Sequence, residues 1–221
     1  MLRCAAKTLK GTRCKFQTKT KYCGKHGQPS SHTSRPSQPS LSLRQLTQQA
    51  KPDFNLLWAA ENGHLVVLEH AVKLGANIHI RDDAALRHAA KNGHLPIVKF
   101  LIRHGANVQA KDNDALVSAA YGGHFPVVQY LVQKGADIHA GGDYALKWAA
   151  YYGHLPLVQF LVQHEADIHA SSDYAVQVAA QNGHLPVVQY LVEHGARIAA
   201  GTIRKSAKHG HFSVVKYLQS K

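Results

Sequence analysis

The sequence predicts an all-α solenoid of about six repeated helix pairs, running from about residue 53 to residue 221. Three observations support this fold class. A Gly-His dipeptide recurs every 30 residues from Gly63 to Gly183 and once more, after 27 residues, at Gly210. Apolar residues within each unit follow helical spacing, as in Val127-Val128 with Leu131-Val132. Each unit also carries helix-starting and helix-ending residues at fixed positions, as two short stacked helices require.

The first helix of each unit is predicted to begin at a polar residue and to end at the glycine before His. A side-chain oxygen at the helix start is expected to accept a hydrogen bond from an unpaired backbone N–H of its own helix. The closing glycine suits the left-handed conformation in which many helices end. The starting residues are Asp53, Asp83, Asn113, Asp143 and Asp173.

The second helix of most units is predicted to begin at a proline, which is preset for the first helical turn, and to end at a glycine. The prolines are Pro96, Pro126, Pro156 and Pro186, and the glycines are Gly75, Gly105, Gly135 and Gly195. Glu165 replaces the glycine in one unit, and a positive φ there would cost roughly 1 kcal/mol. Both helices are short, so only stacking against neighbouring repeats is expected to stabilise them.

The amino-acid pattern of the repeat is specific. Residues 183–192 read Gly-His-Leu-Pro-Val-Val-Gln-Tyr-Leu-Val, and such runs are followed by Gly-Ala-Asp-Ile-His at residues 135–139. This pattern resembles the ankyrin repeat over about three quarters of the chain. The unit departs from the usual length of about 33 residues, and Ala84-Ala85-Leu86-Arg87 replaces the usual Thr-Pro-Leu-His opening. The missing residues are expected to shorten the hairpin that projects between repeats.

The resemblance implies a non-enzymatic scaffold or adaptor for protein–protein interaction. Thirty-residue units of this kind also resemble the large ankyrin families of giant amoebal viruses, which implies a virus-encoded protein acting on host or viral proteins. The chain is expected to be a monomer in the cytoplasm or nucleus of the host cell. No stretch reaches 18 apolar residues, so no membrane partner is expected. Nothing in the sequence resembles a nucleophile with its base or a phosphate-binding loop.

In ankyrin proteins, the first-helix positions that vary within a fixed frame resemble the concave recognition surface. Aromatic residues gather at these positions in the central units, and such residues favour protein interfaces. The predicted partner-binding residues are Tyr121, Tyr144, Trp148, Tyr151, Tyr152 and Tyr174, with Lys147 at the same surface. The alternative is that these rings pack between repeats. A second aromatic series on the second helices is predicted to serve packing: Phe100, Tyr130, Phe160, Tyr190 and Tyr217.

Histidines form two rows at repeat spacing. The first row, which is expected to hydrogen-bond local backbone, comprises His64, His94, His124, His154, His184 and His211. The second row, His79, His139 and His169, is expected to be solvated, with a surface metal as the alternative.

Residues 1–28 are predicted to form a small basic module with one structural zinc ion. All three cysteines of the chain lie here, and Cys4, Cys14, Cys23 and His26 form a closed set of four zinc ligands. So short a segment has no core of its own, so the metal would supply its folding energy. The alternative is a disordered basic tail with unpaired thiols.

Residues 29–52 read as a polar Pro/Ser/Gln linker, within which residues 43–50 are expected to form a short helix that covers the first repeat. The net charge of +13 is concentrated before the repeats, since residues 1–52 carry eleven Lys or Arg and no Asp or Glu. A second function is therefore left open, in which residues 1–28 bind nucleic acid. A third is that this segment is a nuclear-targeting or solubilising tail.

Overall fold

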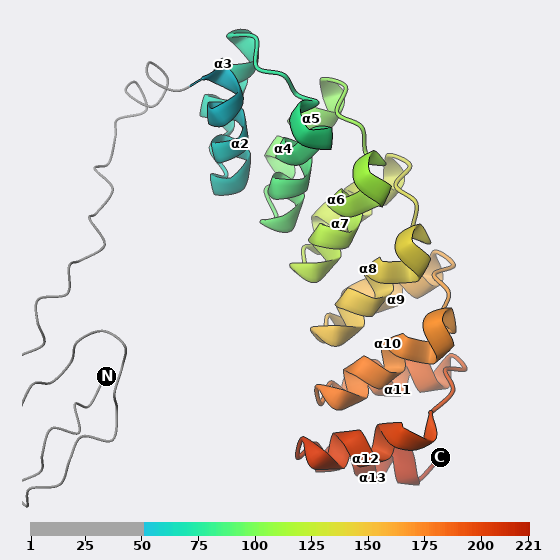
Figure 1. Ribbon diagram of the computed structural model, residues 1–221. Helices are drawn as coiled ribbons and strands as arrows, with labels where there is room; N and C mark the ends of the chain where they lie inside the picture. The colour runs from blue at the N-terminus through green and yellow to red at the C-terminus, as the bar shows by residue number, and fades with distance from the viewer. Residues whose placement is uncertain (1–50) are drawn as a thin grey trace, which may run out of the picture. The chain divides into compact units, whose positions relative to one another are not determined.

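The computed structural model describes residues 51–221, which form a stack of six helix pairs (Figure 1). The first helices of the pairs are α2 (Pro52–Asn62), α4 (Ile80–Lys91), α6 (Ala110–Tyr121), α8 (Ala140–Tyr151), α10 (Ala170–Gln181) and α12 (Ala200–Lys208). The second helices are α3 (Leu65–Lys73), α5 (Leu95–Arg103), α7 (Phe125–Gln133), α9 (Leu155–Gln163), α11 (Leu185–Glu193) and α13 (Phe212–Gln219). Over these residues the predicted all-helical solenoid is confirmed.

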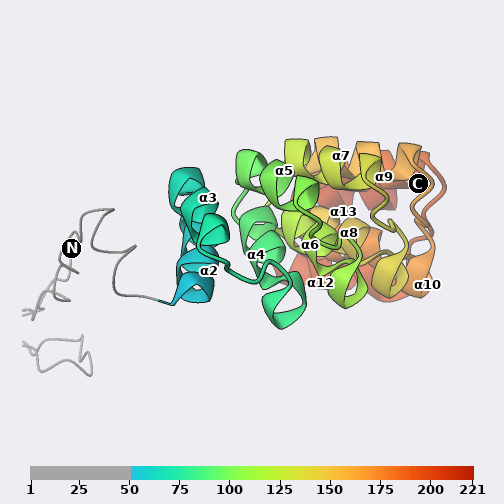
Figure 2. The same ribbon diagram turned by 90° about the horizontal axis from the view of Figure 1, so that it is seen from above.

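The helices form two layers, seen most clearly for α2 to α7 in Figure 2. One layer holds the first helices and the other holds the second helices. Neighbouring first helices contact one another more extensively than neighbouring second helices do. We call the outer surface of the first-helix layer the first-helix face.

One apolar core runs through the stack between the two layers. In the central repeats the first helix contributes Leu116 and the pair Ala119-Ala120, and the second helix contributes Val128 and Leu131, all 0% exposed. The small alanines allow neighbouring first helices to approach closely, while the branched side chains fill the space between the layers. The repeats therefore stabilise one another through a continuous core.

The predicted helix ends are confirmed. The glycines of the Gly-His pairs have φ between 74° and 81°, and the glycines that follow the second helices have φ between 88° and 99°. Pro96, Pro126, Pro156 and Pro186 each lie in the first turn of a second helix. Glu165 has φ 70°, so it holds the left-handed conformation that was suspected from its place in the repeat.

Replacing Glu165 with Gly is expected to raise the free energy of unfolding by about 0.5–1 kcal/mol, because relief of left-handed strain outweighs the greater freedom of glycine in the unfolded chain. Urea denaturation of both proteins measures this difference. Gly135→Ala is the matched opposite change, since φ is 88° there and no atom lies within 4 Å of an added Cβ. It should destabilise by about 1 kcal/mol, and an unstable Glu165→Gly variant would contradict the strain.

The connection between repeats differs from the shortened hairpin that we expected. Three consecutive residues at the start of α4, α6, α8 and α10 form one turn of left-handed helix, with φ between 51° and 70°. These are residues 81–83, 111–113, 141–143 and 171–173. A non-glycine residue in this conformation costs roughly 1–2 kcal/mol, so the contacts that the turn makes must offset the strain. The helix start at α12 lacks this turn, which accounts for the shorter spacing of the sixth unit.

The polar residue that ends each left-handed turn bonds the next repeat, so its predicted role as an N-cap of its own helix is wrong. Asp83 Oδ1 accepts a hydrogen bond from the backbone N–H of Asn107, 3.1 Å away, and Asp143 Oδ1 accepts one from Asp167 at 2.9 Å. Asn113 and Asp173 form the same bond across a separation of 24 residues, and so does Asp53, which follows no left-handed turn. We call these five bonds the inter-repeat ladder.

Both histidine rows also contribute to contacts that were not predicted. His94, His124 and His184 place Nε2 within 2.9–3.1 Å of a backbone carbonyl 33 residues earlier, so these three histidines bond the preceding repeat and not local backbone. In the second row, His79, His139 and His169 place Nδ1 2.7–3.1 Å from the ladder carboxylate of their own repeat. Within residues 51–221 no group of three or more His, Cys, Asp or Glu is placed to hold a metal ion.

The second-helix aromatics Phe100, Tyr130, Phe160, Tyr190 and Tyr217 are half-buried and pack against the core, as predicted. None of the helices α2 to α13 is long and apolar enough to cross a bilayer. The predicted zinc ligands Cys4, Cys14, Cys23 and His26, and the predicted helix over residues 43–50, lie outside the described residues.

Candidate protein-binding surface

The predicted binding residues come from three neighbouring first helices. Residues three or four apart share one face of a helix, which places Tyr144, Trp148 and Tyr151 together along α8. Tyr121 occupies on α6 the repeat position of Tyr151, and Tyr174 occupies on α10 that of Tyr144. Stacking of the first helices therefore brings all of these rings to adjacent places on the first-helix face.

Four of the rings are in direct contact, and Trp148 and Tyr152 each contact the other three. The Trp148 ring lies 5.4 Å from that of Tyr121 and 5.7 Å from that of Tyr151, edge to face in both cases. Tyr152, immediately after α8, lies 4.8 Å from Tyr121 and 4.9 Å from Tyr151. These centroid distances fall within the favourable range of about 4.5–7 Å for aromatic pairs. We call Tyr121, Trp148, Tyr151 and Tyr152 the aromatic cluster.

The rings are accessible to a partner. The five tyrosines Tyr121, Tyr144, Tyr151, Tyr152 and Tyr174 are 38–51% exposed, and Trp148 is partly buried beneath its neighbours. Exposed aromatic residues gathered at one place are typical of interaction sites. The structure thus brings the predicted residues together and leaves them accessible, while their binding of a partner stays a prediction.

Lys147 differs from its expected place on the surface, since it is buried, with 8% of the residue exposed. Its Nζ donates a hydrogen bond to Ser171 Oγ at 2.8 Å and lies 4.9 Å from the ring centre of Tyr144. The long side chain passes under the ring because the left-handed turns of two repeats meet here. Lys147 is therefore part of the floor of the surface and not of its rim.

A groove of about 390 Å³ opens beside the aromatic cluster, lined by Tyr144, Lys147, Trp148, Tyr151 and Tyr174. Gly141 is needed for its shape, because a Cβ at Gly141 would lie 2.4 Å from the ring of Tyr144. Sequence reasoning missed Gly141 and Ser171 as residues of this site. A signal for Gly141 was present, since only this unit carries two glycines, Gly141-Gly142, in the turn.

The hydroxyl of Tyr152 in the aromatic cluster is uncharged at physiological pH. A hydrogen bond with Tyr121 and, next, burial raise the pKa of Tyr152 to about 12. Because this pKa is raised above the ordinary value for tyrosine, any stability that the hydroxyl contributes is present below about pH 10 and is lost as pH rises through about 12.

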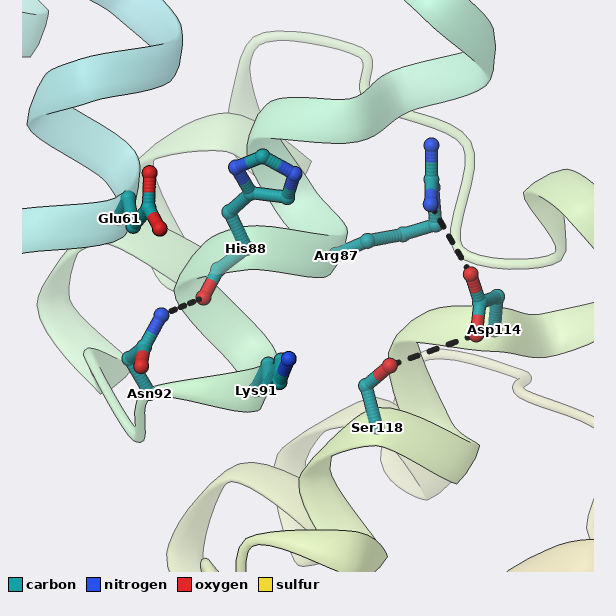
Figure 3. A pocket seen from close by; sticks show the side chains of 7 residues that line it. All are labelled: Glu61, Arg87, His88, Lys91, Asn92, Asp114 and Ser118. Carbon is teal, nitrogen blue, oxygen red and sulfur yellow. Dashed lines mark hydrogen bonds and ion pairs between the residues drawn. The ribbon is translucent and has the colours of Figure 1, made fainter. Parts of the chain in front are cut away.

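The N-terminal part of the first-helix face is polar (Figure 3). A groove of about 270 Å³ there is lined by Glu61, Arg87, His88, Lys91, Asn92, Asp114 and Ser118. Arg87 Nη1 pairs with Asp114 Oδ2 at 3.0 Å, and Ser118 Oγ donates to Asp114 Oδ1 at 3.3 Å. This part of the face thus carries charges of both signs, including the Arg87–Asp114 pair, in contrast to the aromatic part.

The fold and this surface define the class of the molecule as a helical repeat protein with an exposed aromatic surface on its first-helix face. Comparison with family models supports this class. A model for ankyrin repeats in three copies matches residues 56–141, and a model for ankyrin repeats in many copies matches residues 146–192 and 176–219. The chain belongs to the ankyrin-repeat family. Among curated proteins, none matches the chain.

Membership of this family carries a general function. Ankyrin repeats generally mediate protein–protein interactions, and proteins built from them are typically non-enzymatic interaction scaffolds. The chain accordingly has the architecture of a scaffold or adaptor.

Proposed function

We propose that this chain is an adaptor that binds a protein partner through the first-helix face, centred on the aromatic cluster and the neighbouring groove. The observation that carries the proposal is that Trp148 contacts three half-exposed tyrosines and lines a groove with two more, Tyr144 and Tyr174. Tyrosine and tryptophan bury a large area at little cost in side-chain entropy, and they dominate the binding energy of many interfaces. The rest of the interface would surround these rings and exclude water.

Replacing Tyr174 with Ala is expected to weaken binding of the partner by about 2 kcal/mol, close to 30-fold, and to leave the thermal midpoint nearly unchanged, because this ring is 47% exposed. Titration calorimetry with a partner identified by proximity labelling measures the affinity. Trp148→Ala should weaken binding at least as much, although it also removes ring contacts within the cluster.

Phe212→Ala is the matched control, since Phe212 is 71% exposed on the second-helix layer. It should leave the affinity unchanged. Equal losses for Phe212→Ala and Tyr174→Ala would show that the first-helix face is not the binding site.

The finer identity of the adaptor rests on resemblance. We infer a virus-encoded monomer that acts on a host or viral protein in the cytoplasm or nucleus of an infected cell. What supports this is the 30-residue length of the units, which resembles that of giant amoebal virus ankyrin families. Residues 1–28 would attach the adaptor to a second component.

A second function is favoured by the charge of the N-terminal segment, in which nucleic acid binds to residues 1–28. Lys7, Lys10, Arg13, Lys15 and further basic residues alternate there with Phe16 and Tyr22. Binding to DNA or RNA that falls steeply with salt and disappears when residues 1–28 are deleted would support this function. Nucleic-acid binding by residues 53–221 alone would contradict it.

The full chain is expected to bind one zinc ion through Cys4, Cys14, Cys23 and His26, because three thiolates and one imidazole suit tetrahedral structural zinc. Metal analysis after purification without chelators should find one zinc per chain, and Cys14→Ser should reduce this sharply. Deleting residues 1–28 should abolish it. A metal-free full chain, or zinc retained by residues 53–221, would count against the site.

A further inference from the structure

Lys147 is a buried cation without an anionic partner among the described residues. The ion pairs within residues 51–221 join Arg87 to Asp114 and three histidines to ladder carboxylates, and none involves Lys147. The neighbouring carboxylate of Asp143 is already engaged, since its Oδ1 accepts from the backbone N–H of Asp167 and lies 3.1 Å from His139 Nδ1. The charge of Lys147 is thus left without a counter-charge.

A buried charge is costly unless it is paired and hydrogen-bonded. An ammonium group has three N–H donors, and here one bonds Ser171 Oγ while the ring of Tyr144 lies beside the group. The ammonium therefore has capacity for a further acceptor. Because Lys147 lines the groove between Tyr144 and Tyr174, that acceptor can enter from the groove.

We infer that the groove receives an Asp or Glu side chain of the protein partner, whose carboxylate pairs with Lys147 Nζ. The apolar stem of that side chain packs between the rings of Tyr144, Trp148 and Tyr174. This inference rests on the proposed function, and it specifies the chemistry that the partner must present. Charge complementarity is the argument: the groove lining contains one cation and no carboxylate.

The geometry favours a carboxylate over a phosphate group. A phosphate carries close to two negative charges at neutral pH and is usually bound by clusters of arginine. The groove offers a single ammonium, with no arginine among its lining residues. Its volume of about 390 Å³ lies near the lower end of the roughly 300–1,000 Å³ typical of ligand pockets, which suits one side chain with its flanking backbone.

The test begins with a random peptide library displayed on phage and selected against the full chain. Each peptide is fused at its C-terminus, so that every carboxylate sampled is a side chain. Selected peptides are expected to share an Asp or Glu at one fixed position. Peptides selected on the Lys147→Met variant, which keeps an unbranched stem and removes the charge, should not share an acidic residue. Peptides selected on Lys147→Arg should still share it.

Affinity measurements on one selected peptide then test the pairing directly. By fluorescence polarisation, changing its shared acidic residue to the matching amide should weaken binding to the wild-type chain at least tenfold. The same change should cost less than twofold on Lys147→Met, because the partner charge is already absent. Lys99→Met is the matched control, as Lys99 Nζ lies 5.5 Å from the ring centre of Tyr130 on the second-helix layer, and it should leave affinity unchanged.

Different failures have different meanings. Peptides whose binding is weakened by Tyr174→Ala but not by Lys147→Met would overturn this inference and leave the proposed function intact. Peptides whose binding needs neither residue would contradict both the inference and the proposed function. The same holds if the library enriches no better on the wild-type chain than on a double variant that carries Lys147→Met and Tyr174→Ala. Tighter binding when phosphoserine replaces the shared acidic residue, or by a free peptide C-terminus, would overturn the choice of an Asp or Glu side chain. Circular dichroism of each variant confirms that it is folded.

Discussion

Replacing Leu131 with Ala is expected to lower the free energy of unfolding by about 2–5 kcal/mol, through lost burial and the cavity that remains. Leu131 lies on α7 in the centre of the stack and is 0% exposed. Urea denaturation followed by circular dichroism measures the loss. Because each repeat contacts only its neighbours, the mutation should accelerate hydrogen exchange most in α4 to α9.

Leu74→Ala is the matched control, because Leu74 is 51% exposed at the end of α3. It should cost less than about 0.5 kcal/mol, as expected for a surface change. A loss below about 1 kcal/mol for Leu131→Ala would show that the core-facing side of the second helix has been misassigned.

Replacing Asp143 with Ala is expected to destabilise the protein by about 2–4 kcal/mol. The change removes the carboxylate that accepts from the backbone N–H of Asp167, and a hydrogen bond to a charged group contributes about 1.5–3 kcal/mol. It also places alanine at φ 62°, and alanine is less favourable than Asp or Asn in the left-handed conformation. Chemical denaturation measures the sum of both effects.

Asp143→Asn separates the inter-repeat ladder from the ion pair with His139. Asn113 occupies the same position in the preceding repeat and accepts from the backbone N–H of Asp137 at 2.8 Å, so Asn should preserve the ladder bond at Asp143. We expect a loss below about 1 kcal/mol, since His139 is more than half exposed and its pairing with Asp143 contributes little. Equal losses for Asn and Ala would mean that charge, and not the ladder bond, holds the repeats together at this point.

Most of the helical frame could be predicted because its signals are local. Gly93 and Gly105 mark helix ends through their own backbone conformation, and Pro96 marks a helix start through its fixed φ. The conformation of Glu165 could be suspected for the same reason, since repeat alignment places it where other units have glycine. These signals depend only on the residue and its place in the repeat.

The left-handed turns could not be predicted, because Arg81-Asp82-Asp83 and Lys111-Asp112-Asn113 are not residues that favour positive φ as glycine does. Their strain is offset by contacts with the next repeat, which no local pattern reveals. The same limit explains the error at Asp83 and its equivalents. An Asp before a helix has the sequence pattern of an N-cap. The same pattern is present whether its side chain bonds its own helix or a backbone N–H 24 residues later.

The sequence predicted most residues of the candidate site but not the burial of Lys147 within it. Repeat alignment identified Tyr121, Trp148 and Tyr174 because they vary within a constant frame. It placed Lys147 at the same surface because that position also varies within the frame. The structure places Lys147 beside Tyr144, whose ring fits because Gly141 has no Cβ, and Ser171 Oγ accepts the Lys147 hydrogen bond. Such an arrangement depends on two repeats meeting, so the sequence of one unit does not reveal it.

Site-specific photo-crosslinking in the expressing cell tests the central claim, that the first-helix face around the aromatic cluster binds the partner, most directly. A photoreactive phenylalanine analogue replaces Tyr144 or Tyr174 in one set of chains, and Lys99 or Phe212, both exposed on the second-helix layer, in the other. The account predicts that Tyr144 and Tyr174 crosslink to the same protein and that the second-helix positions do not. Crosslinks to one protein from Lys99 or Phe212, with none from Tyr144 and Tyr174, would contradict it.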